Sequence, residues 1–457
     1  MNFMSVERIR YYSTNLKSEK VSFMEALLRG LAPDGGLYMP SEIPVLAQPV
    51  LREMRDMSYP EIAFTILKKL IGDEIDEKVL SNLCKEAYDF DVLLEHVVAG
   101  RYIMRLDRGP TASFKDFAAR MMSRLMQHYL SEEKRKLTIL TATSGDTGSA
   151  VASAFYSLEN IKVIILFPLN EVSAMQRKQM TTLGRNITIL GINGKFDDCQ
   201  RLVKNAFTDS SLSHLPLSSA NSINTGRLLP QSVYYFYAWA KLRRNDSEKI
   251  IFSVPSGNFG NLMGGLIAGR MGLPVEKFVI ATNSNGEVPE FLGTGKYEPL
   301  IPSVNCISSA MNVGHPSNLA RIVALYGGVM NEKGEMIRVP DLENMRKDLA
   351  GISISDDKTR NTIAECYKKY SVILEPHGAV AWRGLSDYIN DLGISEEQLS
   401  VTLETAHPAK FQDEILSTAG IKPELPESMA GLESKEENYL RLGNDYQELR
   451  SLLLNNL

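Results

Sequence analysis

A lysine lies between two phenylalanines in the segment SFKDF, residues 113–117, where helical periodicity begins. Ser113 and Asp116 have the spacing of a capping box, so one interpretation makes Lys115 a solvated residue in the first turn of a helix. A cation is mildly disfavoured there, because the helix macrodipole is positive at this end. The same field would lower the pKa of a lysine, and an unprotonated lysine can form a Schiff base with an aldehyde.

Two glycine-rich turns follow predicted strands and lead into predicted helices. In an open α/β sheet such turns lie at the carboxyl ends of the strands, where free backbone N–H groups can bind an anion. Neither turn matches GxGxxG or the GK[ST] loop, so the specific signals of a dinucleotide or ATP site are missing. The first turn contains Thr143, Ser144, Gly145, Asp146, Thr147 and Gly148, and the second contains Gly257, Asn258, Phe259, Gly260 and Asn261.

A third polar segment, SSANSINTGR, places Asn221, Ser222, Asn224 and Arg227 close together and suits a second oxyanion. A phosphate-binding turn combined with an unprotonated lysine predicts pyridoxal phosphate. This cofactor needs a phosphate cup, a lysine for its Schiff base and a partner for its pyridine nitrogen. Tight turns without a ligand are the structural alternative for the two glycine-rich segments, and an Asn/Ser loop that runs into a capped helix is the alternative for the third.

The bulk composition indicates a globular protein in a reducing compartment. The 457 residues are 44% hydrophobic and 23% charged with a net charge of -5, which argues against a nucleic-acid-binding surface. The four cysteines lie far apart, so neither a metal site nor a disulfide framework is predicted. The N-terminal stretch MNFMSVERIRYYSTNLKSEK lacks an apolar core, and no segment is long and apolar enough to cross a bilayer, which favours the cytoplasm.

The elements that must position these residues follow an α/β pattern. From about residue 100 onward, apolar runs of strand length alternate with helical segments, which predicts two doubly wound, mostly parallel sheets with a cleft between them. The predicted strands are RYIMRL, KLTILTAT, IKVIILF, ITILGI, KIIFSV, FVIAT, SVILE and LSVTLE. We predict a mainly helical N-terminal domain over residues 1–95, a catalytic region of two α/β lobes over 96–412, and a helical tail docked on the surface over 413–457.

Eight motifs along the chain resemble those of the threonine synthase family, whose superfamily includes tryptophan synthase β and cysteine synthase. They are YYST, GLAPDGGLYMP, GPTASFKDFAAR, TATSGDTGSAVA, SANSIN, SVPSGNFGN, EPHGAVA and ETAHPAKF, in the family's order over about residues 10–412. The resemblance implies a pyridoxal-phosphate-dependent carbon–oxygen lyase that converts O-phospho-L-homoserine and water to L-threonine and phosphate by γ-elimination and β-addition. The chain departs from the family at residues 13–16, STNL, where relatives usually read STRG, and no role is assigned there.

The resemblance also implies roles for individual residues. Lys115 matches the lysine that forms the Schiff base and moves protons, and Thr405 matches the neutral partner of the pyridine nitrogen. Asp146 stands where relatives often place an asparagine beside the phenolic oxygen of the cofactor, and a carboxylate there needs a proton or a compensating donor. The cofactor phosphate is implied to lie against Gly257, Asn258, Phe259, Gly260 and Asn261, the substrate carboxylate against Thr143, Ser144 and Thr147, and the substrate phosphate against Asn221, Ser222 and Arg227.

Three histidines, His315, His377 and His407, are predicted to be hydrogen-bonded structural residues rather than general bases, because the lysine already supplies a base. Three other functions stay open: a pyridoxal-phosphate phospho-lyase that yields 2-oxobutanoate and phosphate, a nucleotide- or metabolite-binding protein without covalent chemistry, and a catalytically silent scaffold. The predicted partner is a small-molecule substrate, with no nucleic acid and no membrane, and the predicted assembly is a monomer or homodimer.

Overall fold

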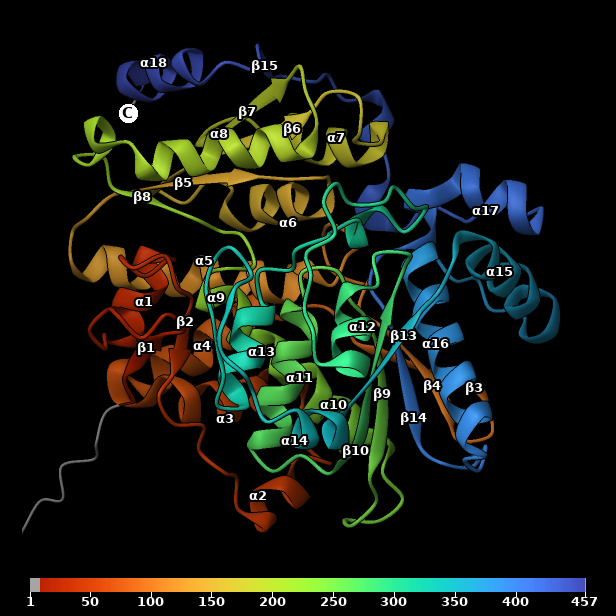
Figure 1. Cartoon of the computed structure of the whole chain (residues 1–457). Coiled ribbons are helices and arrows are strands. Elements are labelled where there is room, and N and C mark those ends of the chain that lie inside the picture. The colour runs from red at the N-terminus through yellow and green to blue at the C-terminus, as the bar shows by residue number, and fades with distance from the viewer. Residues whose placement is uncertain (1–8, 457) are drawn as a thin grey trace, which may run out of the picture.

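The structure of the chain is a computed structural model that describes residues 9–456. Within these residues the chain forms two large sheets that lie one above the other in Figure 1. The predicted α/β class with two mostly parallel sheets is therefore confirmed. Residues 1–8, which belong to the N-terminal stretch for which no signal is predicted, lie outside the described residues.

The larger sheet has six strands in the order β13-β10-β9-β14-β4-β3. All neighbours are parallel except the edge pair β3 and β4, which is antiparallel. Strands β9 and β14 are buried along their whole length, as expected for a parallel sheet that helices cover on both faces. The strands are β3 (Leu93–Val98), β4 (Arg101–Arg105), β9 (Ile250–Pro255), β10 (Val275–Thr282), β13 (Leu349–Ser353) and β14 (Ser400–Glu404).

The smaller sheet has five strands in the order β15-β7-β6-β5-β8, and every neighbouring pair is parallel. Strand β5 is buried at each position, so the glycine-rich turn after it begins from a rigid support. The strands are β5 (Leu137–Ala142), β6 (Ile161–Pro168), β7 (Ile187–Ile192), β8 (Leu217–Ser218) and β15 (Leu440–Leu442).

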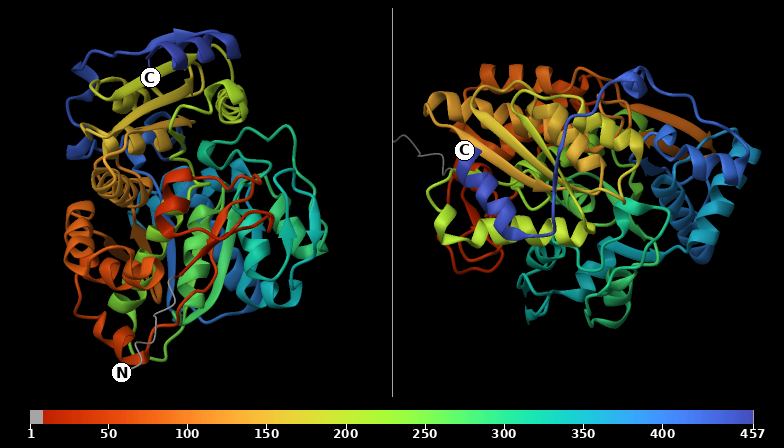
Figure 2. Two further views of the ribbon diagram at one scale, coloured as in Figure 1. Left: turned by 90° about the vertical axis from the view of Figure 1, so that its left-hand side faces the viewer. Right: turned by 90° about the horizontal axis from the view of Figure 1, so that it is seen from above.

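Helices cover both sheets, and one of them, α5, contacts elements of both lobes (Figures 1 and 2). It packs against α6 of the smaller lobe, against α9, and against α4 (Glu77–Ala87) of the N-terminal region. The helices of the two lobes are α5 (Lys115–Glu132), α6 (Asp146–Phe155), α7 (Ala174–Thr181), α8 (Phe196–Thr208), α9 (Thr225–Leu228), α10 (Val233–Leu242), α11 (Gly260–Arg270), α12 (Glu287–Thr294), α13 (Leu319–Leu325), α14 (Leu342–Asp348), α15 (Asp356–Tyr370), α16 (Pro376–Leu392) and α17 (Gln412–Ala419).

The region before β3 is mainly helical and packs against helices α5, α9 and α10 (Figure 1). Capping boxes at Ser22 and Ser58 begin two of its helices, because each serine binds the N3 amide while the N3 glutamate binds back. Its apolar side chains join the same hydrophobic core as α5, α10 and β9. Its elements are β1 (Tyr11–Ser13), α1 (Phe23–Arg29), β2 (Tyr38–Pro40), α2 (Gln48–Glu53), α3 (Tyr59–Ile71) and α4 (Glu77–Ala87).

One predicted strand is wrong. The segment SVILE, residues 371–375, is an irregular connection between α15 and α16. Its apolar residues Val372 and Leu374 are buried against a cluster that includes Trp382, which explains the strand-like pattern. The carbonyl of Ile373 accepts a hydrogen bond from the Arg105 guanidinium at 3.1 Å instead of from a neighbouring strand.

The C-terminal tail is only partly helical. After α17 and two short 3-10 helices it supplies β15, the edge strand beside β7, and helix α18 (Tyr446–Asn456) follows and buries Leu449 and Leu453 in the core of the smaller lobe. Glu437 fastens the tail through two hydrogen bonds from the Arg177 guanidinium, at 2.8 and 2.9 Å. Helix α18 is thus docked on the smaller lobe, whereas β15 extends its sheet. None of the described helices combines the length and the apolar character that a membrane crossing requires.

Candidate active site

The loop before α5 turns differently from the predicted capping box. Helix α5 begins at Lys115, and its N-cap residue is Phe114, whose side chain makes no cap. The Asp116 carboxylate accepts hydrogen bonds from the Thr111 amide at 2.8 Å and from the Thr111 hydroxyl at 2.6 Å. The predicted capping box is therefore wrong, because the loop residue Thr111 reaches Asp116 while Ser113 forms a β-bridge with Ala406.

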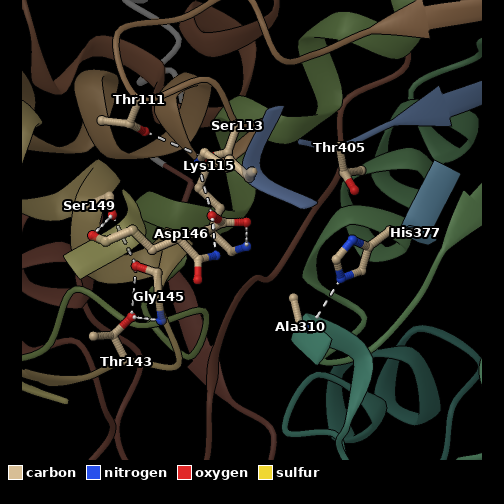
Figure 3. A network of polar contacts seen from close by, with 12 residues as sticks. Thr111, Ser113, Lys115, Thr143, Gly145, Asp146, Ser149, Ala310, His377 and Thr405 are labelled. Carbon is tan, nitrogen blue, oxygen red and sulfur yellow. Dashed lines mark hydrogen bonds and ion pairs between the residues drawn. The ribbon is translucent and has the colours of Figure 1, made fainter. Parts of the chain in front are cut away.

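Lys115 is buried rather than solvated. Its side chain is 13% exposed, and its Nζ lies 3.6 Å from Oδ2 of Asp146. The amide of Phe114 donates to the carbonyl of Thr405 at 2.9 Å, which ties the start of α5 to the end of β14. The solvated interpretation of Lys115 is therefore wrong, and Figure 3 shows Lys115 on one side of the site and Thr405 on the other.

The turn between β5 and α6 is built around one hydroxyl. Oγ1 of Thr143 accepts hydrogen bonds from the amides of Gly145 at 2.9 Å and Gly148 at 2.7 Å. Gly145 has a φ of 133°, and an ideal Cβ there would lie 2.6 Å from the Gln176 side chain, so only glycine fits. Ser144 and Thr147 are half-buried in the same turn. The Thr143 hydroxyl thus shapes the turn, and Asp146 is placed at its exit as the first residue of α6.

Asp146 bridges two buried lysines. Its Oδ1 accepts a hydrogen bond from Nζ of Lys410 at 2.9 Å and another from the Gln176 amide at 2.9 Å, while its Oδ2 faces Lys115. Lys410 lies in a short 3-10 helix, Pro408–Phe411, and its side chain is fully buried. Burial by itself raises the pKa of Asp146, but Lys410 and Lys115 outweigh it and hold this pKa well below its ordinary value. Asp146 is therefore an anion with a compensating donor.

The same surroundings lower the pKa of Lys115. Burial is the largest cause, and the nearby charges of Lys410 and Arg227 act in the same direction, while Asp146 opposes them. The expected direction is thus confirmed, although the main cause is loss of hydration rather than the helix macrodipole. A lysine with a lowered pKa is a nucleophile at moderate pH.

The turn between β9 and α11 offers unpaired donors. Phe259 adopts a left-handed backbone with a φ of 60°, and an ideal Cβ at Gly257 would lie 2.8 Å from the Ala310 carbonyl oxygen. Oδ1 of Asn261 accepts a hydrogen bond from Tyr235 at 2.7 Å, whereas its buried Nδ2 has no partner among residues 9–456. The first amides of a helix also lack intrahelical partners, so the start of α11 suits an anion.

The segment 221–227 lies beside this turn. Nδ2 of Asn318 donates to the carbonyls of Asn258 at 2.9 Å and Ser222 at 3.3 Å and so joins the two loops. Nη1 of Arg321 donates to the same Ser222 carbonyl at 3.1 Å. The side chain of Asn221 accepts a hydrogen bond from Thr141. The predicted cofactor-phosphate and substrate-phosphate segments are thus neighbours in space.

Arg227 is buried without a carboxylate partner at hydrogen-bond distance. Its Nη1 donates to the Ala220 carbonyl at 2.7 Å, and its Nε has no partner among the described residues. Burial lowers the pKa of Arg227 to about 10. A buried guanidinium with a free N–H is suited to an incoming anion, because a charge without a partner is costly in the interior.

The hydroxyl of Thr405 donates to Oε1 of Glu375 at 3.3 Å. Glu375 also accepts hydrogen bonds from the ring of His377 at 2.5 Å and from two amides at the start of α16. The three histidines are hydrogen-bonded: His377 also accepts from the Ala310 amide at 3.1 Å, His407 accepts from the Ala409 amide at 3.2 Å, and His315 contacts the Tyr297 hydroxyl at 2.8 Å. The predicted hydrogen bonding of the three histidines is confirmed, and the absence of a general-base role stays a prediction.

Sequence reasoning missed Lys410, Gln176 and Asn318, which hold Asp146 and the phosphate-binding segments in place. Lys410 lies within the motif ETAHPAKF, but its burial leaves no local pattern in the sequence. The available signal was indirect, because the carboxylate of Asp146 required a compensating donor.

Three family models match the chain. The model described as "Threonine synthase N terminus" matches residues 10–88, "Pyridoxal-phosphate dependent enzyme" matches residues 93–405, and "Threonine synthase, C-terminal" matches residues 379–453. Together they extend from the first described strand into α18.

Individual relatives agree with these models. Threonine synthase of Haemophilus influenzae is 40% identical over 97% of this chain and 99% of the relative, and that of Escherichia coli is 38% identical over 98% of this chain and 100% of the relative. A crystal structure of PLP-bound threonine synthase from Brucella melitensis has a TM-score of 0.90 and 35% identity, and covers 98% of this chain and 99% of its own. The chain belongs to the threonine synthase family of pyridoxal-phosphate-dependent enzymes.

Proposed function

We propose that the chain converts O-phospho-L-homoserine and water to L-threonine and phosphate, with Lys115 as its proton-transferring base. One observation supports these roles above all others. The amine of Lys115 is buried with a lowered pKa and lies 3.6 Å from Asp146, and its helix is tied directly to Thr405. An amine in this position can combine with an aldehyde and then exchange protons with neighbouring carbons.

The residues fit pyridoxal phosphate. The buried, unpaired Nδ2 of Asn261 and the start of α11 supply donors for a phosphate, and Lys115 supplies the amine. Thr405 offers a neutral hydroxyl for the pyridine nitrogen. When bound, the cofactor withdraws electrons from the substrate and so stabilises negative charge that develops at its carbon atoms.

The remaining roles follow from charge and position. Arg227, with Asn221 and Ser222, binds the phosphate of the substrate, because its guanidinium is buried and has a free N–H. The turn after β5 binds the substrate carboxylate through Ser144, Thr147 and amides that Thr143 orients. Lys115 takes the proton from Cα, and its amine moves protons at the adjacent carbons while phosphate leaves Cγ and water adds at Cβ.

The test is a product assay on the purified full-length protein. Its visible absorbance is recorded first, and O-phospho-L-homoserine is then added while threonine, 2-oxobutanoate and phosphate are measured. We expect a yellow protein that forms threonine and phosphate in equal amounts, and a Lys115→Ala variant that has neither the colour nor the activity. Release of 2-oxobutanoate instead of threonine would show a phospho-lyase, and a colourless wild-type protein would favour a binding protein without covalent chemistry.

We also propose the cytoplasm as the compartment, a monomer or homodimer as the assembly, and the division into residues 1–95, 96–412 and 413–457. The four cysteines are present as free thiols, which supports a reducing compartment. The division is supported by the mainly helical character of the first region and by the separate C-terminal elements.

A further inference from the structure

Asp146 and Lys410 form a fully buried ion pair inside the site. The Lys410 side chain is 0% exposed and that of Asp146 is 4% exposed, and their Nζ and Oδ1 atoms are 2.9 Å apart. A buried carboxylate requires charge compensation, and breaking such a pair leaves an unpaired charge in a medium of low polarity. Burying this pair therefore costs desolvation free energy, and the pair lies next to Lys115 in the candidate site.

Lys115 cannot supply this compensation throughout a reaction cycle. Its amine lies 3.6 Å from Oδ2 of Asp146, but under the proposed function it must bind the cofactor, leave it and carry protons between carbon atoms. Lys410 has no such task, since it faces Oδ1 from a separate element after β14. Gln176 contacts the same oxygen but is neutral.

We infer that Lys410 is a positioning residue that acts through Asp146: it keeps Asp146 ionised and oriented toward Lys115 while the Lys115 amine is engaged elsewhere. This inference rests on the proposed function. It also accounts for an aspartate at position 146, because a buried carboxylate in this position is tolerable only together with a buried cation. Activity should therefore depend on Lys410 only as long as residue 146 carries a negative charge.

Other charged groups face the trio and must be kept constant in the test. Arg227 faces Lys115 from α9, Asp116 faces Lys410 from the first turn of α5, and His407 lies three residues before Lys410. None of these is changed in the variants below.

A double-mutant cycle separates action through Asp146 from an independent role. The variants are Lys410→Met, Asp146→Asn and the double variant, with Lys410→Arg as the conservative replacement and exposed Lys422→Met as the matched control. We expect Lys410→Met to lower kcat/KM about 100-fold, as loss of a charged hydrogen-bond partner does, and Asp146→Asn to lower it about 10-fold. The double variant should be no worse than Asp146→Asn, and Lys410→Arg should retain activity within about 10-fold of wild type.

The second readout does not depend on turnover. Full-length protein stripped of its cofactor is mixed with pyridoxal phosphate at a series of pH values, and the rate at which visible absorbance returns is recorded. Removing Lys410 takes away a cation that lowers the pKa of Lys115, so the pH midpoint in Lys410→Met should rise where Asp146 stays ionised and shift toward that of Asp146→Asn where Asp146 takes up a proton. It should fall in Asp146→Asn, because Asp146 raises that pKa. Lys422→Met should match the wild type in both assays.

Three outcomes would overturn the inference: multiplicative effects in the double variant, an unchanged pH midpoint in Lys410→Met, or wild-type behaviour of Lys410→Met. Thermal unfolding of every variant identifies misfolded protein. If Lys410→Met does not fold, Lys410→Arg and the double variant still decide the question. Failure of the proposed function has a different signature, since the wild-type protein itself would then form no threonine.

Discussion

Two buried charge clusters have opposite balances, and Thr405 contacts Glu375 of one and the start of the helix that carries Lys115 of the other. The cation-rich cluster contains the three cations Lys115, Lys410 and Arg227 and the two carboxylates of Asp146 and Asp116. The carboxylate-rich cluster contains Asp107, Glu375 and Glu404 around Arg105, whose Nη1 lies 3.4 Å from Oε1 of Glu404. Both clusters are shielded from water, so each imbalance must be compensated by a ligand or by a proton.

The difference shows how a buried charge is used. Burial and the neighbouring Glu375 raise the pKa of Glu404, so this cluster compensates its excess of carboxylates with a proton. In the cation-rich cluster burial lowers the pKa values of Lys115 and Arg227, and anionic groups of the cofactor and substrate are available to compensate. The carboxylate-rich cluster therefore supports the structure, whereas under the proposed function the cation-rich cluster binds anionic ligands.

The largest effect is expected at Arg227. Arg227→Lys keeps the charge but loses the planar fork and the free Nε, so kcat/KM for O-phospho-L-homoserine should fall about 100-fold, mainly through a higher KM. Steady-state kinetics measures this, with exposed Arg135→Lys as the matched control. Unchanged kinetics, or a loss of thermal stability alone, would show that Arg227 has a structural role. The two clusters would then not differ in function.

An intermediate effect is expected at Glu375. Its carboxylate accepts four hydrogen bonds, including one at 2.7 Å from the His377 amide and one at 3.0 Å from the Gly378 amide. Glu375→Gln replaces one acceptor oxygen with a donor, so the free energy of unfolding should fall by about 1–3 kcal/mol. Chemical denaturation measures the free energy of unfolding, with Glu365→Gln at an exposed position of α15 as the control. A variant as stable as wild type would contradict the structural role.

The smallest effect is expected at Glu404. A folded-state pKa raised above the ordinary value of 4.5 means that the proton stabilises the fold in acid, and that this contribution is lost as pH rises through the folded pKa. Glu404→Gln carries no such proton, so its stability does not depend on this titration. The thermal midpoint of the variant minus that of the wild type should therefore increase by about 1–2 °C as pH rises above 5. Exposed Glu424→Gln should show no trend. A difference that does not change with pH would refute a protonated Glu404.

Most of the fold could be predicted from the sequence, because buried parallel strands are apolar throughout. The apolar pattern does not predict strands β3 and β13, because both are partly exposed and lack continuous apolar runs. The segment around Val372 had the composition of a strand, but its position between α15 and α16 gives it no strand partner. Periodicity reports burial and not hydrogen-bond partners, so it could not separate these cases.

The site was predictable where motifs are local. The turns after β5 and β9 were found from glycine spacing, and the family resemblance assigned their ligands, although the individual roles stay predictions. Lys410 could not be found in this way, since it meets Asp146 only through the folded chain. The turn before Lys115 was also mispredicted, because the Thr111 hydroxyl competes with Ser113 for Asp116.

The late position of β15 has a consequence for how the protein is made. The other four strands of its sheet come from residues 137–218, whereas β15 comes from residues 440–442. During synthesis the sheet that supports Asp146 is therefore complete only after residue 442 has been added. Until then, the backbone N–H and C=O groups on the outer edge of β7 have no strand partner. A chain that ends between these segments would keep this edge free to pair with another copy.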